Sequence, residues 1–145
     1  MIDLKIGNRT VPLYYSTYEM IAIQKEIGCT AFQLREEVFG IDQEDEDDPK
    51  SLRVKCAEDV GKVEKLCTLI RILGNAGLEE SGKEPDLTDK WIKRHMKPVL
   101  INHYAVAAAA EILEGNKLES PAMEHQNEPV DEGLEEENAK KQPGN

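Results

Sequence analysis

The sequence predicts a mainly α protein: a small helical domain of about five helices with an N-terminal β-hairpin and a disordered acidic C-terminal tail. Apolar residues recur at three-to-four spacing along residues 48–82, which is typical of an amphipathic helix. They alternate with polar residues at the start of the chain, as in a half-buried strand. Because the chain has 145 residues, we expect one domain, residues 1–116, followed by the tail, residues 117–145.

Two short strands are expected before the first helix. The segment from Ile2 to Ile6 alternates apolar and polar side chains, and the segment from Thr10 to Tyr14 continues as a second strand. Gly7 and Asn8 between them can adopt the left-handed conformations that a tight turn needs. A single hairpin is marginal in water, so this one is expected to pack on helices.

Capping residues mark the first two helices. Ser16 is a favourable N-cap, and Glu19 three residues later completes a capping box for a helix that runs to Ile27. Thr30 then caps a second helix, residues 31–39. The apolar residues of the first helix are expected to face largely inward: Met20, Ile21, Ile23 and Ile27.

The apolar pattern of residues 48–82 predicts one long central helix. Asp48 is the expected N-cap, Pro49 suits the first helical position, and Gly82 suits the left-handed position after the end. Gly74 and Gly77 each weaken a helix by about 1 kcal/mol relative to alanine. The helix therefore either bends there or has another backbone packed closely against it.

Two further helices are expected after the central one. Thr88 caps a short helix that carries the only tryptophan, and Leu87 and Ile92 have the spacing of a hydrophobic staple. Pro98 opens the last helix, which continues to Gly115. This last helix is rich in alanine, which allows a neighbouring helix to approach closely.

The formal net charge of −11 is concentrated in two segments. Residues 42–48 hold six acids and no base, and residues 117–145 hold eight acids and three lysines. The remainder has 15 acids and 15 bases, so its net charge is zero. We therefore expect a solvated acidic loop and an acidic tail. Binding to nucleic acid is not expected, because it requires a basic surface.

Motifs for chemistry are missing from the sequence. Counted from Asp42, the sixth and twelfth positions of a calcium loop would be Asp47 and Arg53, where the EF-hand requires glycine and glutamate. Neither the three histidines nor the three cysteines have metal-ligand spacing. We expect no catalytic residue, no cofactor and no metal, and therefore not an enzyme.

The cysteines and the N-terminus bear on the compartment. Cys29, Cys56 and Cys67 are expected to be buried free thiols, because they are odd in number and two of them lie on the apolar stripe of the central helix. No apolar run approaches the length of a membrane span, and the first residues do not have the pattern of a signal peptide. The cytoplasm is the expected location.

A set of short motifs extends along nearly the whole chain. They are Gly7, Arg9, Val11-Pro12-Leu13, Tyr18, Met20, Ile72-Leu73-Gly74-Asn75-Ala76-Gly77-Leu78-Glu79, Gly82, Leu87-Thr88-Asp89, Trp91-Ile92, Met96, Pro98, Val130-Asp131 and Leu134-Glu135-Glu136. In this order they resemble the tail assembly chaperones of long-tailed phages and prophages of Gram-positive hosts. The Gly-Asn-Ala-Gly-Leu run is the most specific of these motifs.

This resemblance implies a non-enzymatic role in phage morphogenesis. Such a chaperone would bind the tape-measure protein and help to recruit tail-tube subunits around it. It would act in the cytoplasm of the bacterial host and would not be expected in the mature virion. Neither a membrane nor a nucleic acid is an expected partner, and self-association is left open.

The candidate partner-binding residues lie near the glycines of the central helix and in the tail. They are Leu87, Trp91, Ile92, Met96 and Leu134. The competing interpretation of Trp91 is that it belongs to the core. An alternative function is a small acidic, phage-encoded regulatory protein that binds a host or phage protein through the acidic segments.

Overall fold

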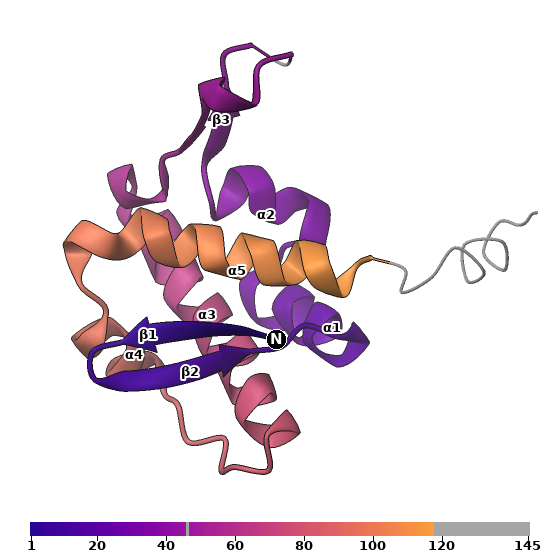
Figure 1. Ribbon diagram of the computed structural model, residues 1–145, viewed down its shortest axis with the longest axis vertical. Helices are drawn as coiled ribbons and strands as arrows, with labels where there is room; N and C mark the ends of the chain where they lie inside the picture. The colour runs from indigo at the N-terminus through magenta and orange to yellow at the C-terminus, as the bar shows by residue number, and fades with distance from the viewer. Residues whose placement is uncertain (46, 118–145) are drawn as a thin grey trace, which may run out of the picture. The chain divides into compact units, whose positions relative to one another are not determined.

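The structure is a computed structural model that describes residues 1–45 and 47–117. Within this part of the chain, helices predominate and two short β-hairpins accompany them (Figure 1). The helices and strands are β1 (Ile2–Ile6), β2 (Arg9–Leu13), α1 (Thr17–Ile27), α2 (Ala31–Glu37), β3 (Ile41–Gln43), β4 (Leu52–Val54), α3 (Val60–Glu80), α4 (Asp89–His95) and α5 (Ile101–Gly115). The expected mainly helical fold with an N-terminal hairpin is confirmed. The tail beyond residue 117 lies outside the described residues.

The first hairpin forms as the alternation predicts. Strands β1 and β2 pair antiparallel with Leu4 opposite Val11, and Gly7 in the turn has φ +62°. The inward side chains of both strands, including Leu4 and Ile6, are buried. A carboxylate that sequence reasoning missed ties this hairpin to α5, because the buried Glu111 accepts a hydrogen bond from the Ile2 N–H at 3.0 Å.

The predicted caps of α1 and α2 are confirmed. The Ser16 N–H donates to Glu19 Oε1 at 3.0 Å, and the Ser16 hydroxyl donates to the same oxygen at 2.5 Å. At the start of α2 the Thr30 N–H donates to Gln33 Oε1 at 2.9 Å, and the Gln33 N–H donates to the Thr30 hydroxyl oxygen at 3.2 Å. These side chains accept hydrogen bonds from backbone N–H groups that have no partner inside a helix. The capping residues therefore fix the starts of both helices.

The predicted start of the central helix is wrong. Helix α3 begins at Val60, and the N-cap is Asp59, whose side chain accepts hydrogen bonds from the N–H groups of Gly61 and Lys62. Residues 49–58 instead contain two short 3₁₀ turns and strand β4. Apolar spacing alone could not separate this irregular segment from the helix, because its few apolar residues happen to continue the three-to-four spacing.

The acidic segment was expected to be a solvated loop, and the structure shows that it is part of a second hairpin. The described residues of this segment, 42–45 and 47–48, belong to the end of β3 and the tip of a second hairpin, in which β3 pairs antiparallel with β4. The hydroxyl of Ser51 donates to the carbonyl oxygens of Asp45 and Asp48, at 2.8 and 2.7 Å, and holds the described part of the tip. Figure 1 shows this hairpin extending away from the helices.

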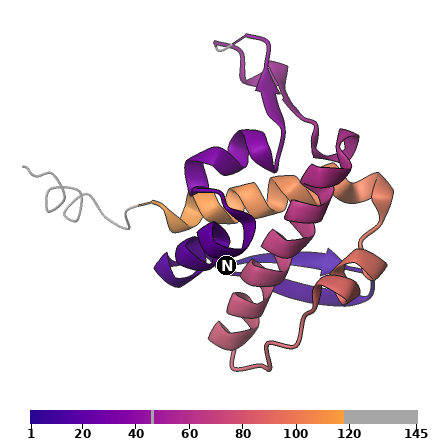
Figure 2. The same cartoon turned by 180° about the vertical axis from the view of Figure 1, so that it is seen from behind.

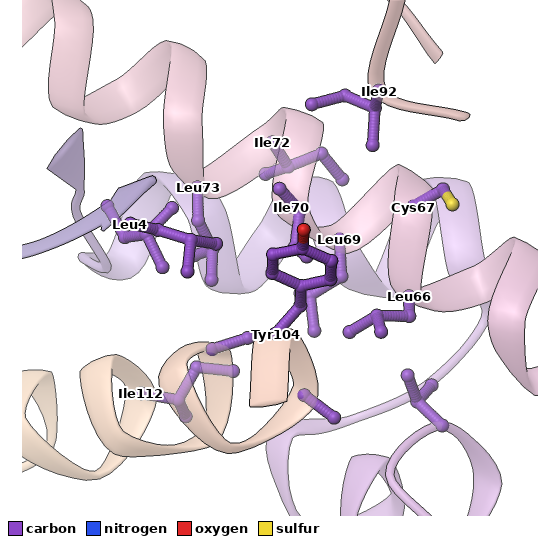
Figure 3. Packing of buried hydrophobic residues seen from close by; sticks show 14 of the residues in the cluster. Leu4, Leu66, Cys67, Leu69, Ile70, Ile72, Leu73, Ile92, Tyr104 and Ile112 are labelled. Atoms are coloured by element: carbon purple, nitrogen blue, oxygen red, sulfur yellow. The ribbon is translucent and has the colours of Figure 1, made fainter. Parts of the chain in front are cut away.

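Helix α3 is the centre of the core. It contacts β2, α1, α4 and α5, and Figure 2 shows it running diagonally across the first hairpin and α5. Its buried side chains include Leu69, Ile70 and Leu73, which are fully inaccessible to solvent. The ring of Tyr104 from α5 lies among them (Figure 3). The unit Met1–Gly115 is therefore built on one mainly aliphatic core.

The glycines of α3 permit close packing of another backbone. This was one of the two possibilities that the sequence left open, the other being a bend in the helix. The helix continues without interruption through Gly74 and Gly77. A Cβ atom at Gly77 would overlap the carbonyl group of Pro12 in β2, and one at Gly74 would lie 2.6 Å from Leu87 Cδ1. The end of the helix at Gly82 is also confirmed: this residue has φ +73°, and the Lys83 N–H donates to the Leu78 carbonyl.

The three cysteines are buried and free, as predicted. Burial, with a smaller contribution from the nearby Cys67, raises the pKa of the Cys56 thiol to about 11. Burial likewise raises the pKa of Cys67. Because the thiolate is the reactive form, these residues are packing groups of the core at neutral pH. In the part of the chain that is described, no helix is both long and apolar enough to cross a bilayer.

Candidate functional site

Most of the predicted partner-binding residues lie in the core, and this corrects the expectation that they form an exposed face. Leu87, Ile92 and Met96 are 4%, 0% and 6% exposed. The reason is the hydrophobic staple: Leu87 before the helix and Ile92 inside it both point towards α3, and Met96 is one turn beyond Ile92. Trp91 is half-buried at the edge of this contact. Leu134 lies outside the described residues.

The Gly-Asn-Ala-Gly-Leu run positions the segment before α4. The Asn75 side chain is the central element, because it donates to the Leu87 carbonyl at 3.1 Å and accepts from the Leu87 N–H at 2.9 Å. Gly74, one residue earlier, leaves the space that the Leu87 side chain fills. This motif therefore has a structural role: it anchors the entry to α4 on the surface of α3.

Trp91 is held between side chains from two other places in the chain. The His95 ring stacks on the indole with 4.4 Å between ring centroids, and the Arg9 guanidinium lies 5.6 Å from the indole centroid. Arg9 in turn pairs with Asp86 at 2.7 Å, and its hydrogen bond lowers the pKa of that carboxyl. The indole therefore contacts both His95 and Arg9 where it reaches the surface.

The outer face of α4 is basic. Lys90, Lys93 and Arg94 are exposed, and they line a hollow of about 460 Å³. A second hollow, of about 420 Å³, is lined by Lys90 and Arg94 together with Thr88, Trp91 and His95. Counting charges over large segments concealed this face, because the bases of α4 were averaged with acids elsewhere in residues 1–41 and 49–116.

The one acid of α4 faces the other way. Asp89 accepts a hydrogen bond from Arg71 Nε at 2.6 Å and another from the Thr68 hydroxyl at 3.3 Å. The other end of the Arg71 guanidinium pairs with Glu26 of α1. Arg71 thus links α1, α3 and α4, and it removes the negative charge of Asp89 from the outer face of α4.

Helix α1 carries an apolar face that points to solvent, which corrects the predicted inward orientation of two residues. Met20 and Ile21 are 43% and 48% exposed, whereas Ile23 is buried. Tyr18 is 77% exposed and lies one turn before Ile21. Together with Ala22, Lys25 and Glu26, Tyr18 and Ile21 line a hollow of about 300 Å³.

Helix α5 also has an exposed apolar stripe. Val106, Ala110 and Leu113 are spaced by four and three residues and are all exposed, Leu113 at 64%. Two sequence signals could have revealed these faces: α1 has apolar residues around more than half of its circumference, and a seven-residue spacing joins Val106 to Leu113. Exposed apolar stripes on helices are a common feature of surfaces that bind another polypeptide.

The described residues contain no group of three or more histidine, cysteine or acidic side chains that could hold a metal ion. Comparison of the chain with protein-family models, with characterised proteins and with solved structures gave no match. A proposal for its function therefore rests on the sequence motifs and on the chemistry of these surfaces.

Proposed function

We propose that this protein is a phage or prophage tail assembly chaperone that binds the tape-measure protein through the exposed apolar face of α1. The observation that carries this proposal is the pair Tyr18 and Ile21, two large apolar side chains that border one hollow and face solvent. An amphipathic helix of a client could place one apolar side chain in this hollow and cover both residues.

The surroundings of the hollow suit a helical client. Lys25 lies at its rim beside Glu26, which already pairs with Arg71, so an acidic side chain of a client helix would find a partner in Lys25. The exposed stripe of α5 offers additional apolar area, which a long client with repeated amphipathic helices could use. A chaperone of this kind works by covering apolar surface and needs no catalytic group.

The cellular role follows from the resemblance of the sequence motifs. The chain would keep the tape-measure protein in solution in the cytoplasm of the bacterial host until tail-tube subunits enclose it. The two acidic segments would help to keep the loaded complex soluble through their negative charge. The chain would then be absent from the finished virion.

Co-production with the tape-measure protein of the same genome tests this function. The chain should keep the tape-measure protein in the soluble fraction and copurify with it. The double variant Tyr18→Ser/Ile21→Ser should lose most of this effect, since it removes the apolar atoms around the hollow. The matched control is Val60→Ser/Val99→Ser, which changes two side chains that are 79% and 86% exposed elsewhere.

All four of these residues are exposed, so both variants should unfold at nearly the temperature of the parent chain. The proposal is wrong if the parent chain fails to retain the tape-measure protein in solution. It is also wrong if the α1 variant and the control retain it equally well.

A further inference from the structure

The outer face of α4 is an unusual concentration of positive charge in an acidic protein. Residues 89–97 contain four bases and one acid, a net charge of +3, although the whole chain has a net charge of −11. Among the described residues, Lys90 and Arg94 have no carboxylate within salt-bridge distance, and Lys93 has only a loose pair with Glu64 at 3.6 Å. These cations are therefore available to a ligand.

The positions of the cations on this face determine how far apart the negative charges of a ligand should be. Lys90 and Arg94 are four residues apart on one helix, so they lie one above the other along its surface. Both residues border the two hollows, and the half-buried indole of Trp91 forms an apolar wall of one hollow. The stack with His95 and the Arg9–Asp86 pair keep that wall in place.

The negative charge on the rest of the chain favours a short acidic protein segment over a nucleic acid as the ligand. A nucleic acid is a long polyanion, and it would meet repulsion from the acidic hairpin tip and the acidic chain as a whole. A short acidic segment of a protein needs only the local cations. Its apolar side chains would also gain contact with the indole of Trp91.

We propose that this face binds an acidic amphipathic helix of a partner protein. Two carboxylates one helical turn apart would pair with Lys90 and Arg94, and an apolar side chain between them would pack on Trp91. This binding site is separate from the apolar hollow of α1 and does not depend on the proposed chaperone function.

Trp91 provides a direct readout, because it is the only tryptophan in the chain. The probe is a synthetic 16-residue helical peptide in which glutamates at positions i and i+4 flank one leucine (~16 residues is about four turns). Titration into the full chain should change the Trp91 emission saturably. A matched peptide with glutamine in place of each glutamate should bind about tenfold more weakly, and salt should weaken the acidic peptide further.

Charge-reversal variants of the protein provide a second test of the proposal. Lys90→Glu/Arg94→Glu should reduce the affinity for the acidic peptide by about tenfold or more. The control Lys50→Glu/Lys83→Glu changes the net charge equally at exposed lysines outside α4 and should leave the affinity within about twofold. All four side chains are exposed, so folding, checked by circular dichroism, should be unchanged.

Several results would overturn the proposal. They are equal binding of the acidic and the glutamine peptides, equal loss in both charge-reversal variants, and tighter binding of a single-stranded RNA 20-mer than of the acidic peptide. An affinity that rises sharply when residues 118–145 are deleted would assign the face to this chain's own acidic segment instead. None of these measurements involves the tape-measure protein, so their failure leaves the α1 proposal untouched.

Discussion

Replacing Gly77 by alanine should destabilise the protein by at least about 3 kcal/mol, because the new methyl group would overlap the backbone of β2. The added Cβ would lie 1.8 Å from the Pro12 carbonyl oxygen and 3.1 Å from the Pro12 Cβ. A carbonyl in a paired strand cannot rotate away as a side chain can. The hairpin would have to leave α3, and the buried residues of both strands would lose their contacts.

A series of glycine variants, measured by urea unfolding, separates this contact from helix propensity. In Gly74→Ala the overlap is with side-chain ends, Leu87 Cδ1 at 2.6 Å and Val11 Cγ1 at 2.8 Å, so the expected loss is smaller, about 1–2 kcal/mol. In Gly61→Ala, at the exposed start of the same helix, the new Cβ would lie 3.2 Å from Asp59 Oδ1, whose side chain can shift, so the stability should change by no more than about 0.5 kcal/mol. Similar losses in Gly77→Ala and Gly61→Ala would contradict the close approach of β2.

Replacing Asn75 by aspartate should cost about 2 kcal/mol, because it removes one hydrogen-bond donor and places a charge against a carbonyl. The Asn75 amide group donates to the Leu87 carbonyl, and a carboxylate has no N–H to donate. The acceptor bond from the Leu87 N–H would survive. The segment before α4 would therefore keep one of its two hydrogen bonds to α3. The surroundings of the Trp91 indole, and with them its fluorescence, would change.

The matched control for Asn75→Asp is Asn8→Asp, which adds the same charge in the exposed turn of the first hairpin. Its effect on the free energy of unfolding should stay within about 0.5 kcal/mol. Equal losses in the two variants would mean that added negative charge, and not the lost donor, causes the destabilisation. A normal stability of Asn75→Asp would show that the two hydrogen bonds to Leu87 do not hold α4 in place.

Local signals in the sequence were sufficient for most of the secondary structure. Ser16 with Glu19, Thr30 and Thr88 each mark a helix start through a side chain that hydrogen-bonds nearby N–H groups. Such bonds depend on residues only a few positions apart, so they can be inferred without knowing the tertiary structure. The glycines that end α1 and α3, Gly28 and Gly82, are predictable for the same reason.

The start of α3 and the second hairpin were not predictable in this way. The pairing of Ile41–Gln43 with Leu52–Val54 joins segments about ten residues apart, and neither strand is long enough to show a clear alternation. Asp59 was overlooked as an N-cap because Asp48-Pro49 has the stronger local signal. The choice between two good caps was decided by tertiary contacts, which a local pattern does not contain.

The candidate site was only partly predictable. The sequence motifs draw attention to Trp91, which is half-buried, but Leu87, Ile92 and Met96, expected among the partner-binding residues, fill the core. The staple spacing of Leu87 and Ile92 already favours packing inside the domain, and the structure shows both residues buried. Conversely, the pattern of α1 predicts that Ile21 faces largely inward, and the structure places it beside Tyr18 at the surface.

The central claim is that the exposed face of α1 contacts the tape-measure protein, and site-specific photocrosslinking in the copurified complex tests it most directly. A photoreactive benzoylphenylalanine would replace Tyr18 in one sample and Val60 in another, positions that are 77% and 79% exposed. We expect a crosslink to the tape-measure protein from position 18 and little or none from position 60. Equal yields from both positions, or a crosslink from position 60 alone, would contradict the claim.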